Sequence, residues 1–170
     1  MKLIYFPGFG GSEKSNTYLK ILSKYPDSEA IIYNNTDADE AFMQIENQLK
    51  NIATDISLIV GQSLGGFWAE HFAIKHNLKL VLINPSFEPF TSLEKYNIPI
   101  QELEKFRKFK PEIRAKSKVS IILSKNDTVV DSTPVLEKYE NFANFKYVDG
   151  DHKFTDYDVL FDEIKSVLIP

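Results

Sequence analysis

The sequence predicts an α/β fold in which six short strands form one parallel sheet with helices on both faces. Short apolar runs alternate with amphipathic segments along the whole chain, and this alternation is typical of a parallel sheet. The 170 residues suit one domain of ordinary size. Because no repeat, low-complexity tract or linker interrupts the pattern, we expect residues 1–170 to form a single domain.

The expected strands are apolar runs of four or five residues. The first is followed by Pro7 and Gly8, which end a strand, and the fourth by Asn84 and Pro85. A strand that is buried on both faces of a parallel sheet is apolar throughout, as these runs nearly are. The six runs cover residues 2–6, 29–33, 56–60, 80–83, 119–123 and 145–148.

Helices are expected between these strands, where apolar residues recur at helical spacing. The clearest example places Ala41, Phe42, Ile45 and Leu49 on one face. The predicted helices cover residues 17–23, 39–50, 64–76, 134–141 and 156–168. Residues 86–118 are more polar and irregular, with one helix from about residue 100 to 110 after Pro99. We expect this segment to be a short lid-like insertion over a site.

Composition excludes several classes of function. The net charge is −4, and only Arg107 and Arg114 are arginines, so no basic surface for nucleic acid is expected. The absence of cysteine excludes disulfides, thiolate nucleophiles and cysteine–zinc sites. The apolar run at the N-terminus is too short for a signal peptide, and no run approaches the ~18 residues of a membrane span. A soluble, cytoplasmic protein is therefore expected.

A nucleophile motif follows the third strand. Residues 61–65 read G-x-S-x-G with Ser63 at the centre, between a strand and an amphipathic helix. A serine on such a sharp turn projects its hydroxyl from the sheet edge, and the crowded turn favours glycine two residues before and after it. Two glycines can flank a serine by chance, but the position between strand and helix favours a catalytic Ser63.

A serine hydroxyl needs a base, and the chain has three histidines. His71 and His76 lie more than two turns into the helix after Ser63, too far to reach it, and are expected to be ordinary helix residues. His152 lies in a turn just after the sixth strand. Since the ends of parallel strands meet at one edge of the sheet, His152 is the expected base.

The orienting acid is expected after the fifth strand. Asp127 lies in the turn there, and Asp131 lies four residues further on, near a helix start. We favour Asp127 because the carboxylate belongs close to the strand end, and Asp131 is the alternative. Asp149 and Asp151 flank His152, and their expected role is turn formation.

An oxyanion hole requires two backbone N–H donors. We expect one from Leu64, which follows the nucleophile, and one from Phe9 in the glycine-rich loop after the first strand. That loop also resembles a phosphate loop, but Glu13 stands where the second glycine belongs and would repel phosphate. No nucleotide cofactor and no metal are therefore expected.

Five segments together resemble the small YqiA-like esterases of the α/β-hydrolase superfamily. They are the loop after the first strand, the nucleophile motif, Asn-Pro after the fourth strand, and the Asp127 and His152 turns: residues 7–12, 61–66, 84–85, 126–131 and 150–154. The resemblance implies an α/β-hydrolase fold, for which we expect strand order 2-1-3-4-5-6. It also implies cofactor-free hydrolysis of carboxylic esters or acyl thioesters. Pro7 stands where the family often has histidine and, lacking an N–H, cannot donate to an oxyanion.

The insertion contains four apolar residues with two possible roles. Phe87, Phe90, Leu93 and Tyr96 line an acyl pocket, or they pack the insertion onto the core; the sequence leaves both open. The insertion is short, which favours an open site and compact acyl groups. The alternative function is a non-catalytic ligand-binding module with the same fold. The sequence does not separate ester hydrolysis from amide hydrolysis or acyl transfer.

Overall fold

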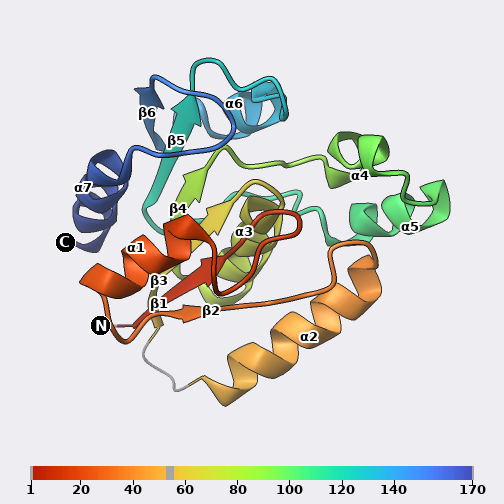
Figure 1. Ribbon diagram of the computed structural model, residues 1–170, viewed down its shortest axis with the longest axis horizontal. Helices are drawn as coiled ribbons and strands as arrows, with labels where there is room; N and C mark the ends of the chain where they lie inside the picture. The colour runs from red at the N-terminus through yellow and green to blue at the C-terminus, as the bar shows by residue number, and fades with distance from the viewer. Residues whose placement is uncertain (1, 53–55, 170) are drawn as a thin grey trace.

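A six-stranded parallel sheet forms the centre of the computed structural model, which describes residues 2–52 and 56–169 (Figure 1). The strand order is β2-β1-β3-β4-β5-β6, and each neighbouring pair is parallel, so the predicted topology is confirmed. The strands are β1 (Lys2–Phe6), β2 (Glu29–Ala30), β3 (Ile56–Gln62), β4 (Lys79–Ile83), β5 (Val119–Ser124) and β6 (Asn144–Val148).

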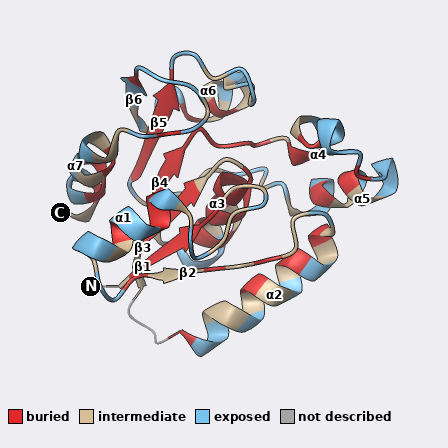
Figure 2. Cartoon of the chain, in the orientation of Figure 1, coloured by how far each residue is buried: buried red, intermediate tan, exposed pale blue. Residues whose placement is uncertain are grey.

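Helices cover both faces of the sheet. Helices α1 and α7 pack on one face, and α2, α3, α6 and the insertion pack on the other. The helices are α1 (Asn16–Lys24), α2 (Ala38–Asn51), α3 (Leu64–His76), α4 (Pro89–Ser92), α5 (Ile100–Lys105), α6 (Thr133–Tyr139) and α7 (Tyr157–Leu168), with 3-10 turns η1 (Glu94–Tyr96) and η2 (Phe106–Phe109). Figure 2 shows the central strands buried beneath these layers.

Alternation along the strands divides the apolar side chains into two cores. In β1, Ile4 and Phe6 point toward α3, whereas Leu3 and Tyr5 point toward α1 and α7. Successive side chains of a strand point to opposite faces, so one continuous apolar run serves both cores. Trp68 of α3 is the largest fully buried side chain of the first core.

Strand β2 is shorter than the predicted residues 29–33. Ladder pairing ends at Ala30, although the amide of Ile31 still donates to Tyr5 O at 2.9 Å. Beyond this point, the side chain of Gln48 in α2 makes two hydrogen bonds to the backbone of Ile32. Gln48 Oε1 accepts from Ile32 N at 3.1 Å, and Gln48 Nε2 donates to Ile32 O at 2.6 Å. Side-chain amides of α2 thus replace strand pairing, because β2 is the edge strand and has no further neighbour.

The insertion contains more structure than the sequence indicated. The helix expected over residues 100–110 is split into α5 and the 3-10 turn η2, and α4 and η1 precede it.

A buried carboxylate helps to attach the insertion to the rest of the fold. Glu70 of α3 accepts from Tyr139 Oη at 2.7 Å and pairs with Lys138 Nζ at 2.9 Å. Lys138 also donates to Pro111 O at 2.6 Å, which joins the end of the insertion to α3 and α6.

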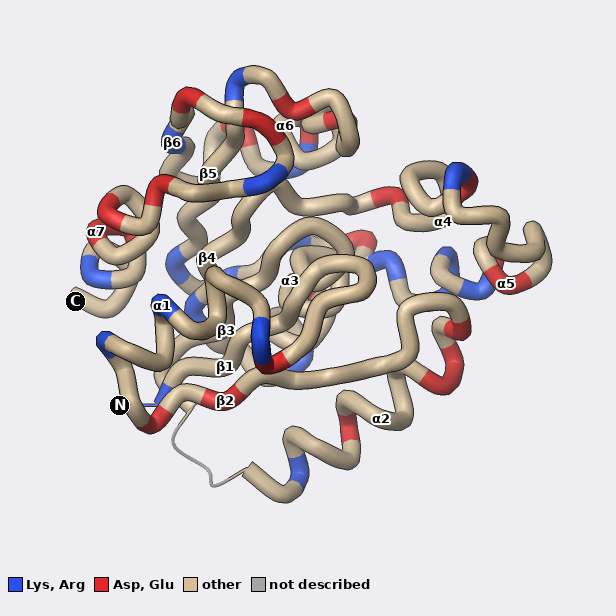
Figure 3. The backbone as a smooth tube through the Cα atoms, viewed as in Figure 1, with Lys and Arg blue, Asp and Glu red and all other residues tan. Residues whose placement is uncertain are grey.

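Charged groups of both signs are interspersed along the outer helices and loops in the view of Figure 3. Basic side chains of the insertion pair with acids, as in Lys108–Asp39 at 3.0 Å and Lys110–Glu88 at 2.7 Å. In the part of the chain that the structure describes, every helix is too short or too polar to cross a bilayer.

His71 of α3 makes stability depend on pH. Burial lowers the pKa of its imidazole below the usual 6.5, and Nδ1 lies 2.9 Å from the carbonyl oxygen of Phe109. As the pH falls below 6.5, the unfolded chain takes up a proton before the folded chain does, so stability decreases. We expect the unfolding temperature of the wild type to fall between pH 7.5 and 5.5, and that of His71→Asn to fall less. Equal slopes in thermal melts of the two proteins would contradict this role.

Candidate active site

Ser63 occupies a strained turn between β3 and α3. Its backbone has φ 53° and ψ −123°, a conformation that non-glycine residues rarely adopt. The surroundings hold it there: Ser63 N donates to Ile83 O at 3.0 Å, and Ser63 O accepts from Gly66 N at 2.8 Å and Ser86 N at 3.0 Å. The strand, turn and helix order is therefore that expected for a nucleophile elbow.

The first turn of α3 lies directly against the loop after β1. A Cβ added to Gly65 would lie 2.1 Å from Phe6 O and 2.5 Å from Pro7 O, so only glycine fits. On the other side of the turn, a Cβ at Gly8 would lie 3.1 Å from Ser63 Cβ. The loop after β1 thus passes close to the Ser63 side chain.

His152 lies between Ser63 and Asp127. Its Nε2 is 2.9 Å from Ser63 Oγ, and its Nδ1 is 2.7 Å from Asp127 Oδ2. The side chain of Asp127 is 10% exposed and that of His152 is 21% exposed, so the site is reachable from solvent mainly at the histidine and serine. In the tautomer whose Nδ1–H group donates a hydrogen bond to the carboxylate, Nε2 carries no proton and can accept the proton of the serine hydroxyl.

Backbone amides fix the carboxylate of Asp127. Its Oδ1 accepts from Val129 N at 2.8 Å and Val130 N at 3.1 Å, which leaves Oδ2 facing His152. The alternative acid, Asp131, accepts instead from Thr133 N at 2.9 Å near the start of α6. This amide lowers the pKa of the Asp131 carboxyl, and the structure gives Asp131 no contact with the histidine among the described residues.

Of the two residues expected to supply oxyanion donors, Leu64 directly follows Ser63 and Phe9 lines the same cavity as Ser63. Leu64 begins α3, so its N–H is one of the unpaired donors of a helix start. Phe9 lies in the turn closed by Gly11 N and Gly8 O at 2.9 Å. Within residues 2–52 and 56–169, neither the Phe9 nor the Leu64 amide donates to a protein acceptor. The oxyanion hole formed by these two amides stays a prediction.

A cavity of about 520 Å³ opens over Ser63 and His152. One wall is aromatic: the ring of Phe9 stacks on Tyr96 of η1, with centroids 4.1 Å apart and planes 12° apart. The other lining residues are mostly polar or small. They are Tyr5, Pro7, Gly8, Gly11, Ser15, Gln62, Thr128, Val129, Asp151 and Lys153.

Only one of the four residues expected in the acyl pocket lines this cavity. Tyr96 does so and is 42% exposed, whereas Phe87, Phe90 and Leu93 are 3%, 7% and 3% exposed. These three side chains belong to the core on the α3 face and pack the insertion onto the sheet. The structure thus differs from the acyl-pocket expectation at Phe87, Phe90 and Leu93 and matches the packing alternative there.

Two tyrosines support the site and were not singled out by sequence reasoning. Tyr5 Oη donates to Gln62 Oε1 at 2.8 Å, and Tyr33 Oη donates to Pro7 O at 2.6 Å. Burial raises the pKa of Tyr5 to about 12, so it remains a donor at neutral pH. Both lie in or just after apolar strands, where a tyrosine reads as one more core residue.

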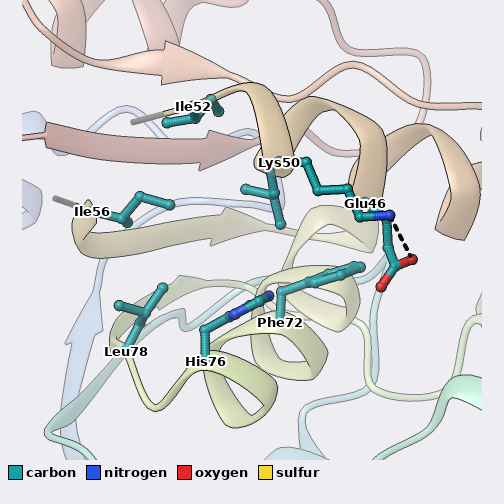
Figure 4. A pocket seen from close by; sticks show the side chains of 8 residues that line it. Glu46, Lys50, Ile52, Ile56, Phe72, His76 and Leu78 are labelled. Carbon is teal, nitrogen blue, oxygen red and sulfur yellow. Dashed lines mark ion pairs between the residues drawn. The ribbon is translucent and has the colours of Figure 1, made fainter. Parts of the chain in front are cut away.

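The remaining histidines lie away from the nucleophile, as expected. His71 contacts Phe109, and His76 lies at the C-terminal end of α3. His76 lines a second cavity of about 390 Å³ between α2 and α3, with apolar walls and the Glu46–Lys50 ion pair at its rim (Figure 4). Its lining includes Ile52 and Ile56, on either side of residues 53–55, which lie outside the described residues.

Two solved structures illustrate the similarity in fold. Alpha/beta hydrolase domain-containing protein 10 from mouse superposes with a TM-score of 0.82 at 15% identity, over 98% of this chain and 89% of the mouse chain. Est1E from Butyrivibrio proteoclasticus gives a TM-score of 0.70 at 14% identity, over 97% and 85% of the two chains. At this level of identity the similarity concerns the fold, and the expected α/β-hydrolase fold is confirmed.

Similarity in sequence extends along nearly the whole chain. A UPF0227 protein of Shewanella sp. (strain ANA-3) is 27% identical over 96% of this chain and 97% of its own length. UPF0227 protein YcfP of Escherichia coli O9:H4 (strain HS) is 25% identical over the same shares of the two chains. The model of the family described as "Uncharacterised protein family (UPF0227)" matches residues 2–169. In agreement with the resemblance seen in the motifs, the chain belongs to the UPF0227 family.

Proposed function

We propose that the protein is a serine hydrolase that cleaves small carboxylic esters or acyl thioesters. In this proposal Ser63 is the nucleophile, His152 the general base and Asp127 the orienting acid. The amides of Phe9 and Leu64 form the oxyanion hole. Tyr96 is the one residue of the insertion that contacts the substrate in this proposal.

One observation carries this proposal: a continuous chain of two hydrogen bonds joins three side chains from three strand ends. Ser63 follows β3, Asp127 follows β5 and His152 follows β6, yet they lie within 2.9 Å and 2.7 Å of one another at the bonding atoms. This constellation activates a serine hydroxyl on several unrelated folds. The strained Ser63 backbone supports the same role, because strain of this kind gathers at functional sites.

Acylation follows from the geometry. Ser63 Oγ attacks the acyl carbonyl carbon while its proton moves to His152 Nε2, and the carbonyl electron pair moves onto oxygen. The Phe9 and Leu64 amides stabilise this oxyanion, and losing one such donor would raise the barrier by about 3 kcal/mol. His152 then gives its proton to the leaving alcohol or thiol, and an acyl ester remains on Ser63.

Deacylation repeats these steps with water in place of the serine. His152 takes a proton from the attacking water, and the same amides stabilise the second oxyanion. Collapse of this intermediate releases the carboxylic acid and returns the proton to Ser63 Oγ. Throughout, the Asp127 carboxylate holds the Nδ1 proton of His152 and stabilises the imidazolium. Only groups of this chain and water take part.

The cavity supports a compact substrate. A volume of about 520 Å³ lies in the lower half of the usual range for ligand sites, about 300–1,000 Å³, and the Phe9–Tyr96 stack offers an apolar surface in the same cavity. Est1E, one of the solved structures with the same fold, has been solved with ferulic acid bound, so this fold accommodates acids of modest size. We therefore expect acetyl and butyryl esters to react faster than long-chain esters.

A fluorophosphonate probe and p-nitrophenyl esters test the proposal together. We expect the wild type to gain one phosphonyl group at Ser63, located by peptide mass spectrometry, and to hydrolyse p-nitrophenyl acetate and butyrate. Ser63→Ala is expected to lose both activities, by a factor of about 10⁶ in turnover. The matched control is Ser23→Ala, which removes a hydroxyl from α1 that donates to Lys20 O at 2.8 Å. A folded wild type that is neither labelled nor active would support the binding-module alternative.

A further inference from the structure

Asn84, at the end of β4, connects three strand ends through one buried side chain. It is 2% exposed. Its Oδ1 accepts from Ser124 N at 2.7 Å, and its Nδ2 donates to Ser124 Oγ at 3.0 Å and to His152 O at 3.4 Å. Its own amide donates to Ile122 O at 2.9 Å. The side chain therefore links the end of β5 to the histidine turn.

The same short segment also holds the nucleophile. Ile83 O accepts from Ser63 N, and Ser86 N donates to Ser63 O, both at 3.0 Å. Residues 83–86 thus contact the Ser63 turn through the backbone and the His152 turn through the Asn84 side chain. Because β3 and β6 are not neighbours in the sheet, this segment provides one of the connections between the two turns.

At its first residue the histidine turn is attached to the Asp127 turn, since Asn126 N donates to Gly150 O at 3.0 Å. The three residues that follow have few attachments. Within residues 151–153, His152 O also accepts from Phe154 N at 3.0 Å, and Lys153 N donates to Asp151 Oδ1 at 2.8 Å. Both bonds are internal to the turn. Among the described parts of the chain, the Asn84 bond is the one hydrogen bond from another element to the backbone of these three residues.

Asparagine suits this position for two reasons. The backbone of Asn84 is left-handed, with φ 43°, and asparagine adopts this conformation more readily than most residues. Its amide also carries one acceptor and two donor hydrogens, which matches the contacts to Ser124 and His152. Aspartate would keep the acceptor and lose the donors, whereas glycine would keep the backbone and lose the side chain.

We propose that Asn84 is a positioning residue that holds the His152 turn so that the imidazole reaches Ser63 and Asp127 at once. This inference rests on the proposed function and adds a residue to it that does not touch the substrate. The imidazole makes its two bonds at opposite ring nitrogens, so a shift of the turn lengthens at least one of them. A misplacement of about 1 Å in such a site lowers the rate by about 100-fold.

The test compares Asn84→Gly with Asn77→Gly. Asn77 has the same left-handed backbone, with φ 53°, but ends α3 at the opposite edge of the sheet. For p-nitrophenyl acetate we expect Asn84→Gly to lower kcat at least about tenfold and to change KM by less than about twofold. Fluorophosphonate labelling should slow by the same factor as kcat. Asn77→Gly should behave as the wild type.

A spectroscopic readout separates positioning from a general loss of stability. In the wild type, the proton between His152 Nδ1 and Asp127 is expected as a far-downfield proton resonance in NMR. We expect this resonance to broaden or vanish in Asn84→Gly and to persist in Asn77→Gly. Ser124→Ala removes the β5 hydroxyl partner of Asn84 and leaves the contact to His152, so it should keep the resonance.

The outcomes are distinct. A folded Asn84→Gly with wild-type kcat and resonance would overturn the inference. If Asn84→Gly is unfolded at the assay temperature, Asn84→Asp takes its place, because its carboxylate still accepts from Ser124 N. A wild type without labelling or turnover would defeat the proposed function, while the resonance in the same variants would still decide whether Asn84 positions His152.

Discussion

Asp127→Asn is expected to lower kcat by about 10⁴-fold while the protein stays folded. The reason lies in the two amides, Val129 N and Val130 N, that bind Asp127 Oδ1. In the variant these donors keep the amide oxygen and turn the NH₂ group toward His152 Nδ1. That nitrogen must then accept, so the ring carries its proton on Nε2, facing Ser63. Steady-state hydrolysis of p-nitrophenyl acetate, with thermal melts of both proteins, measures the effect.

Asp131→Asn is the matched control for this experiment. It removes the same charge four residues further on, from a side chain that binds Thr133 N rather than the histidine. We expect its turnover to remain within about twofold of the wild type. A loss of turnover in Asp131→Asn with an active Asp127→Asn would exchange the two roles and make Asp131 the orienting acid.

The arrangement of the site was accessible to sequence reasoning because parallel strands end at a common edge. Ser63, Asp127 and His152 each follow an apolar run, so the topology alone brings them to one side of the sheet. The G-x-S-x-G pattern and the order Ser, Asp, His then indicate which polar residues meet. Local pattern and topology suffice here because each side chain sits within a few residues of a strand end.

Residues whose position depends on the insertion were not accessible in this way. Phe87, Phe90, Leu93 and Tyr96 look alike in the sequence, yet three are buried in the core and Tyr96 lines the cavity. Short helical turns such as α4 and η1 carry too few residues to show which face is apolar. The direction of each side chain depends on long-range packing against α3, which no local pattern encodes.

Side chains whose hydrogen-bond partners lie far away along the chain were not predicted, for a related reason. Asn84 reads as a residue that ends a strand, and Tyr33 reads as one more core aromatic. Their partners, His152 and Pro7, lie 68 and 26 residues away along the chain. Likewise, Gln48 of α2 binds the backbone of Ile32 where pairing of β2 was expected to continue. This contact was not predicted because nothing in the sequence of the strand shows that its outer edge is unpaired.

Gly65→Ala is expected to cost both stability and activity, although alanine favours the helix that begins at Leu64 by about 1 kcal/mol. The added Cβ would lie 2.1 Å from Phe6 O and 2.5 Å from Pro7 O. These are backbone atoms at the end of β1 and cannot rotate away, so α3 and the loop carrying Phe9 must separate. We expect a loss of 3 kcal/mol or somewhat more, above the usual range for overpacking of about 1–3 kcal/mol. Urea unfolding measures it.

The activity of Gly65→Ala tests whether the loop after β1 supplies an oxyanion donor. If Phe9 N binds the oxyanion, moving this loop by about 1 Å should slow fluorophosphonate labelling of Ser63 by about 100-fold. Gly10→Ala is the comparison, since its Cβ would meet nothing within 4 Å and its φ of 71° costs only about 1–2 kcal/mol of strain. Because Gly10→Ala leaves the contact between Gly65 and β1 intact, its labelling should slow far less. Equal labelling rates in Gly65→Ala and the wild type would mean that the hole does not depend on Phe9, and Leu64 N would remain as its donor.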